Sequence, residues 1–80
     1  MPLVEVKLIE GVFSADEKHQ MMERVTDAMV SVYGEALRPS TWVLIEDVAS
    51  GEWGIGGRAI TSDMVQQMAG RVPAAAPAGT

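Results

Sequence analysis

Cysteine is absent from this chain of 80 residues, and histidine occurs once, as His19. Without cysteine the chain can form neither disulfides nor thiolate-ligated metal sites. With one histidine, a metal site would consist mostly of carboxylates, and no acidic residues have the spacing of such a site. We therefore expect neither a metal ion nor any other cofactor, and we interpret His19 as a solvated residue at the edge of a helix face.

Basic residues are also scarce, with 6 Lys and Arg against 11 Asp and Glu, so the net charge is −5. Phosphate binding depends on clustered Lys and Arg, and no such cluster occurs, which argues against nucleic acid as a partner. Long apolar runs are missing too. No segment approaches the ~20 residues of a transmembrane helix, and the N-terminus lacks the basic-then-apolar pattern of a secretory signal. These absences predict a cytoplasmic protein without a membrane partner.

Two segments rich in β-forming residues, 2–9 and 42–47, are predicted to be strands. Between them, Ser14-Ala15-Asp16-Glu17 is a capping-box pattern, which marks the start of a helix. Gly34 marks its end after Tyr33, because glycine tolerates the left-handed conformation that follows a last turn. Strand, crossover helix and strand form a single β-α-β subunit with parallel strands, so we expect the α/β (α+β) fold class.

One face of this helix is predicted to be apolar and to pack on the sheet. The stripe consists of Met21, Met22, Val25, Ala28, Met29 and Val32. The other sheet face is left uncovered, and parallel sheets rarely stay bare. Hydrophobic residues make up 48% of the chain, more than one small core comfortably hides. We therefore expect the chain to assemble into an oligomer.

Residues 50–58 are dense in glycine around Trp53. The stretch lacks the Gly-Lys-Ser/Thr of a phosphate-binding loop, and we interpret it as a C-terminal hairpin. Thr61 or Ser62 can cap a short helix that runs to Gly70. The domain is therefore expected over 1–70, followed by a flexible Ala/Pro-rich tail at 71–80.

Pro2 is the most informative residue for function. Once Met1 is trimmed, its nitrogen is a secondary amine at the start of an ordered strand. Apolar surroundings disfavour the charged form of an amine and move its pKa down toward neutrality. Such an amine can act as a general base, although a proline at position 2 is by itself a weak signal.

The chain resembles the tautomerase superfamily, and within it the short subunits of the 4-oxalocrotonate tautomerase family, over residues 2–57. Pro2 opening the first strand, the capped helix, the second strand and the run Gly51-Glu52-Trp53-Gly54-Ile55-Gly56-Gly57 carry the resemblance. It implies that Pro2 is the catalytic proline and that Trp53 is the aromatic active-site wall on the hairpin, where the family usually has phenylalanine. It further implies assembly as a hexamer, a trimer of dimers.

Two family arginines that bind substrate carboxylates are replaced, by Val12 and by Trp42. We therefore expect a small carbonyl or enol acid with more apolar character than a muconate dicarboxylate, held in part by Trp42. An enolate oxygen needs hydrogen-bond donors. The candidates are backbone amides near Ile9, and Arg38 and Arg58 reaching from neighbouring subunits.

Three interpretations follow from the resemblance. The leading one is a Pro2-dependent tautomerase that interconverts enol and keto forms, most simply as a homohexamer. The second is a relative of the family's hydratases and dehalogenases, which the missing arginines disfavour. The third is a subunit with little or no turnover in a heterohexamer, whose partner subunit supplies the arginines.

Overall fold

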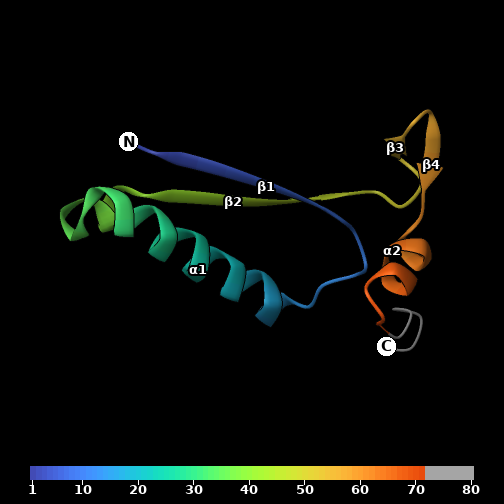
Figure 1. The fold of residues 1–80 in the computed structure, drawn as a ribbon, viewed down its shortest axis with the longest axis horizontal. Helices are drawn as coiled ribbons and strands as arrows, with labels where there is room; N and C mark the ends of the chain where they lie inside the picture. The colour runs from blue at the N-terminus through green and yellow to red at the C-terminus, as the bar shows by residue number, and fades with distance from the viewer. Residues whose placement is uncertain (72–80) are drawn as a thin grey trace. The chain divides into compact units, whose positions relative to one another are not determined.

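The computed structural model describes residues 1–71, so the predicted tail lies almost wholly outside the described residues. Its elements are shown in order along the chain in Figure 1. They are β1 (Leu3–Ile9), α1 (Ala15–Tyr33), the 3-10 helix η1 (Glu35–Ser40), β2 (Trp42–Val48), β3 (Trp53–Ile55), β4 (Arg58–Ile60) and α2 (Ser62–Met68).

The strands β1 and β2 form a two-stranded sheet. At one end the amide of Trp42 donates to the carbonyl oxygen of Pro2 at 3.0 Å, and at the other the amide of Glu10 donates to Val48 at 2.8 Å. The residue numbers of the bonded pairs increase in both strands from one end of the sheet to the other, so the two strands are parallel. This confirms the predicted β-α-β arrangement.

Helix α1 begins and ends where the sequence predicts. The hydroxyl of Ser14 accepts from the amide of Glu17 at 3.1 Å, and the Glu17 carboxylate accepts from the amide of Ser14 at 2.9 Å. At the other end Gly34 has φ 102° and donates its amide to the carbonyl of Val30 at 2.7 Å. The capping box and the terminal glycine are both confirmed.

The predicted apolar stripe of α1 is wrong in its last turns. Val32 is 85% exposed and Ala28 is also exposed, whereas Val30 is buried at 5%. The sequestered residues follow rows of every fourth position, 21–25–29–33 and 22–26–30. Four residues turn a helix by 40° more than a full circle, so these rows rotate around the helix and carry Val32 out to solvent.

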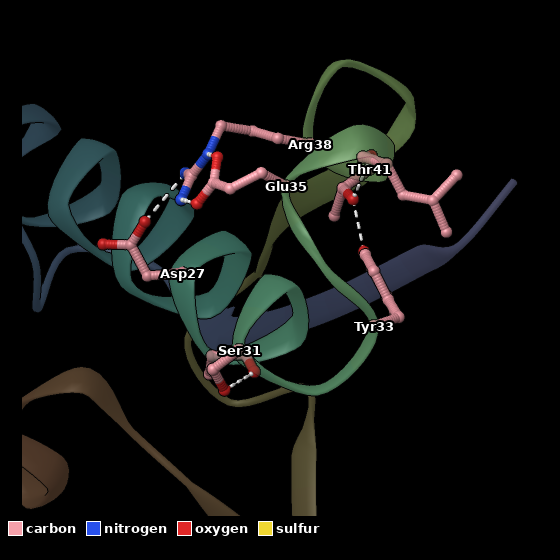
Figure 2. Close-up of polar contacts among 8 residues, drawn as sticks. Asp27, Ser31, Tyr33, Glu35, Arg38 and Thr41 are labelled. Carbon is pink, nitrogen blue, oxygen red and sulfur yellow. Dashed lines mark hydrogen bonds and ion pairs between the residues drawn. The ribbon is translucent and has the colours of Figure 1, made fainter.

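The segment between α1 and β2 is the 3-10 helix η1. Its end is fixed by Thr41, whose hydroxyl donates to the carbonyl of Leu37 at 2.8 Å and whose amide donates to Arg38 at 3.2 Å. Since the single hydroxyl proton of Thr41 is used in this way, the hydroxyl of Tyr33 is the donor in the hydrogen bond between the two side chains (Figure 2).

The chain divides into two compact units. The first comprises Met1–Val6 and Ser14–Glu46, and within it α1 lies along one face of the paired strands (Figure 1). The half-buried strand residues on that face are Val4, Val6, Val43 and Ile45. The opposite face carries Leu3, Trp42 and Leu44, which are 55%, 55% and 42% exposed. Strand alternation places the exposed Glu5 and Glu46 on the same face, so a sheet face with three large apolar side chains between carboxylates is open in the single chain.

Among the described residues, the second unit comprises Lys7–Phe13 and 47–71. Its hairpin pairs β3 with β4 antiparallel, with Trp53 opposite Ile60. Gly56 and Gly57 form the two-residue connection with φ 59° and 82°, the positive values that a type I′ turn requires at both positions. The hairpin predicted from the glycine-rich stretch is confirmed.

Candidate active site

The second unit contains an apolar pocket of about 230 Å³. Residues from the end of β1, from the hairpin and from α2 line it, namely Ile9, Trp53, Ile55, Ile60, Val65 and Met68. The neighbouring Lys7 and Leu8 complete the wall, and almost all of the lining surface is carbon. The pocket can therefore receive an apolar group but offers almost no hydrogen-bonding surface of its own.

The hairpin positions Trp53 in this pocket. Trp53 is the first residue of β3, and its cross-strand neighbour Ile60 also lines the pocket. The amide of Gly51 donates to the carbonyl of Ile60 at 3.0 Å, which ties the chain entering β3 to the end of β4. Gly51 has φ 88°, a conformation that favours glycine. Trp53 is half-buried, and its side chain lines the apolar pocket.

Ile9 is buried where β1 ends, although the alternation of the strand places it on the same face as the exposed Leu3. In the second unit Ile9 lines the pocket together with apolar side chains of the hairpin and α2. Of the residues selected from the sequence, the structure thus brings Ile9 and Trp53 together.

Helix α2 supplies a wall that the sequence interpretation missed. The helix itself was predicted, and Thr61 caps it by accepting the amide of Met64 at 3.3 Å. What went unassigned is its contribution of Val65 and Met68 to the pocket. Their spacing of three residues on a capped helix was the available signal.

Pro2 and Trp42 lie in the first unit. The structure joins them through the backbone hydrogen bond from the amide of Trp42 to Pro2, at the start of the sheet. Pro2 is half-buried, and Met1 before it is exposed. The Trp42 side chain lies on the open face of the sheet beside Leu44 of the same strand.

Arg38 is held at the surface of the first unit by two carboxylates (Figure 2). Its Nη1 contacts Asp27 Oδ1 at 2.8 Å, and its Nε and Nη2 donate to the two oxygens of Glu35 at 2.9 and 3.0 Å. The hydrogen bonds that Arg38 donates to Glu35 lower the pKa of Glu35. The hydrogen bonds that Arg38 donates to Glu35, and secondly to Asp27, raise the pKa of Arg38. Within this chain its charge is therefore already paired.

The other positions discussed for substrate charge differ from Arg38. Arg58 begins β4 opposite Ile55 and is exposed. Val12 is buried, so an arginine at this position would have to desolvate its charge or leave the core. Among residues 1–71, no group of three or more His, Cys, Asp or Glu could hold a metal ion. No helix within the same residues is long and apolar enough to cross a membrane.

Residues 2–63 match the family model described as "Tautomerase enzyme". A probable tautomerase of Dickeya dadantii is 34% identical over 62 residues, which cover 76% of this chain and 90% of that protein. Among solved structures, a 4-oxalocrotonate tautomerase homologue in the tomaymycin biosynthetic pathway, TomN, is 28% identical with a TM-score of 0.67, covering 85% of this chain and 95% of that one. The DmpI structure from Helicobacter pylori is 32% identical with a TM-score of 0.65, covering 74% and 95%.

Proposed function

The chain belongs to the tautomerase family, a group of isomerases, and on that premise we propose that it interconverts the enol and keto forms of a small 2-keto acid with an apolar side group. The observation that carries this proposal is the pocket around Trp53. Its volume of about 230 Å³ exceeds the ~150 Å³ of an apolar cavity that holds benzene. One aromatic or branched aliphatic group therefore fits, whereas a second carboxylate would meet an almost purely carbon surface.

Pro2 is the proposed general base. In the unprocessed chain its nitrogen is an amide, which is not basic, so the proposal requires removal of Met1. The free secondary amine then takes the hydroxyl proton of the enol. It returns a proton to the other carbon of the enol double bond, the one that does not carry the oxygen, so that atoms and charges balance over the cycle. A base of this kind contributes about 10² to 10⁴ in rate.

The developing charge on the substrate oxygen needs a donor. The exposed Arg58 is the candidate that we retain. The backbone amides near Ile9 are less suitable, because that of Glu10 already donates to Val48 and the pocket surface is almost all carbon. Arg38 is a weaker candidate, because binding a substrate with it would cost its contacts to Asp27 and Glu35. Trp42 is proposed to contact the apolar part of the substrate.

The proposal includes assembly of the chain into a hexamer of identical subunits. The exposed Leu3, Trp42 and Leu44 form an apolar face that other copies would cover, which favours obligate association. We define these three residues as the open sheet face. An alternative is a hetero-oligomer in which this chain turns over little. It is favoured by the replacement of both family arginines and by the burial of Val12.

Two measurements on the purified protein test the role of Pro2. Intact mass should show that Met1 has been removed. A ketonisation assay with the enol of phenylpyruvate should then show a loss of at least about 10² in kcat for Pro2→Ala. Pro39→Ala, in the 3-10 helix η1, is the matched control and should retain the activity. Retention of Met1 together with activity that Pro2→Ala leaves unchanged would remove Pro2 from the mechanism.

A further inference from the structure

Most of α2 lies beyond the segment that matches the family model. The match ends at residue 63, whereas the helix runs from Ser62 to Met68. Val65 and Met68 therefore line the pocket from outside the segment that the family model matches. A pocket wall of this kind can differ from one protein to another without disturbing the shared core.

The start of α2 is fastened to neighbouring segments of the second unit. The amide of Ser62 donates to the Ser50 hydroxyl at 2.9 Å. The hydroxyl of Ser62 in turn donates to the carbonyl oxygen of Glu10, directly after β1. The first turn is therefore tied both to the chain that enters the hairpin and to the end of β1.

The middle of α2 is anchored by Gln66, which is 1% exposed. Its side-chain Nε2 donates to the backbone carbonyl of Gly11 at 2.8 Å, and its backbone carbonyl accepts a hydrogen bond from the backbone amide of Arg71 at 2.7 Å. Its Oε1 has no hydrogen-bond partner within residues 1–71. Leaving that oxygen buried costs about 1–3 kcal/mol, so the packing of α2 against this unit has to offset it. The helix is a fixed part of the unit.

The two pocket residues of α2 occupy different depths. Val65 precedes the buried Gln66 and is partly sequestered, while Met68 is one turn further along and exposed. Met64, on the same helix, does not line the pocket. Val65 is thus the α2 side chain whose size most directly limits the cavity, with Met68 at its mouth.

We propose that α2 selects substrates by size, and that Val65 is a specificity-determining residue that limits the apolar group admitted beside Trp53. This inference rests on the proposed function, because it names the part of the substrate that the pocket takes. A single aromatic ring is expected to fit a cavity of about 230 Å³, and a fused two-ring group is expected to meet Val65.

The test compares enols of phenylpyruvate and indole-3-pyruvate in the mature, full-length protein. Val65→Ala should raise the ratio of kcat/KM for the indolyl over the phenyl substrate by at least about fivefold, and Val65→Phe should lower it by a similar factor. Met64→Ala and Met64→Phe are the matched controls and should leave the ratio unchanged. Because the two Val65 variants act in opposite directions, a general loss of folding cannot produce the expected pattern.

A second readout needs no turnover. Chemical shifts of the Trp53 indole N–H are followed by NMR during titration with phenylacetate and 1-naphthylacetate. Val65→Ala should tighten binding of the naphthyl probe relative to the phenyl probe, and the Met64 variants should not. If the wild type turns over no enol, the proposed function fails and this titration alone decides the inference. The inference would be overturned if both assays showed that the Val65 variants leave the size preference unchanged. It would also be overturned if the Met64 variants changed the size preference as much as the Val65 variants do.

Discussion

The two units of the chain treat apolar surface in opposite ways. In the first unit one sheet face is covered by α1, but the open sheet face of Leu3, Trp42 and Leu44 remains exposed. In the second unit the hairpin and α2 enclose their apolar side chains around a pocket, and Ile9 is buried. One strand, β1, shows both situations along its length. The first unit therefore leaves a face that the proposed assembly would cover, whereas the second encloses an apolar pocket within one chain.

The two tryptophans express the same contrast. Trp42 lies on the open face, where association with another subunit would bury it. Trp53 is already half-buried and lines the pocket. Substitutions in the first unit should therefore change assembly, and substitutions in the second should change local stability and substrate choice.

The largest expected effect is on assembly. Leu44→Lys places a charge in the middle of the open sheet face, and burying an unpaired charge at an interface is strongly unfavourable. We expect sedimentation to show a multimer for the wild type and a smaller species for the variant. Val32→Lys is the control, because Val32 is also apolar and is more exposed, at 85% against 42% for Leu44, but lies on α1. A wild-type chain that is a stable monomer at micromolar concentration would contradict the comparison.

Gln66 tests how the second unit holds α2. Gln66→Ala removes the hydrogen bond to Gly11 and leaves a small cavity, so the free energy of unfolding should fall by about 1–3 kcal/mol. The neighbouring Gln67 is exposed, and Gln67→Ala should change the free energy of unfolding by less than about 0.5 kcal/mol. Denaturant unfolding at one fixed protein concentration compares them. Equal effects of both variants would show that α2 is not anchored through Gln66.

The capping box should contribute somewhat less. Ser14→Ala removes the acceptor for the amide of Glu17 and should lower the free energy of unfolding by about 1 kcal/mol. Ser31→Ala provides a contrast inside the same helix, because the Ser31 hydroxyl donates to the carbonyl of Ala28 within one turn and alanine has the higher helix propensity. Thermal unfolding should separate the two variants. A Ser31 variant that melts below the Ser14 variant would refute this assignment.

The smallest effect concerns the exposed ion pair of the first unit. The hydrogen bonds from Arg38 lower the pKa of Glu35 in the folded chain. The resulting stabilisation is present above the ordinary pKa of the carboxyl group and is lost as pH falls through its lowered folded value. Arg38→Gln should raise the pKa of Glu35 in an NMR titration, and Arg58→Gln should not. An unchanged titration of Glu35 in the Arg38 variant would mean that the pair does not persist in solution.

Much of the fold follows from local signals in the sequence. The Ser14–Glu17 capping box, Gly34 and the paired glycines of the hairpin each impose a local geometry, and each is found where predicted. The inward face of α1 was missed at Val30 and Val32 because the contact follows rows of every fourth residue. These rows rotate around the helix axis along its length, so a stripe drawn at one constant angle misses the buried residues of the last turns.

The candidate site was less predictable because it depends on tertiary contacts. Resemblance to the family selected Pro2 and Trp53. The spacing of Val65 and Met68 indicated an apolar helix face, but not that this face would join Trp53 in one pocket. The pairing of Arg38 with Asp27 joins residues 11 positions apart and was equally invisible. The sequence shows which residues are charged, but not which oppositely charged residue each one contacts in the folded chain.

Substrate choice tests the account most directly. The measurement is the ratio of kcat/KM for the enol of phenylpyruvate to that for 2-hydroxymuconate, made with the mature protein. A dicarboxylate would lack the two charge-assisted contacts that the family arginines provide, each worth about 1.5–3 kcal/mol, whereas an aryl group gains contact with Trp53. The account predicts a ratio above one. A preference for the dicarboxylate of tenfold or more, about 1.4 kcal/mol of transition-state discrimination, would contradict it.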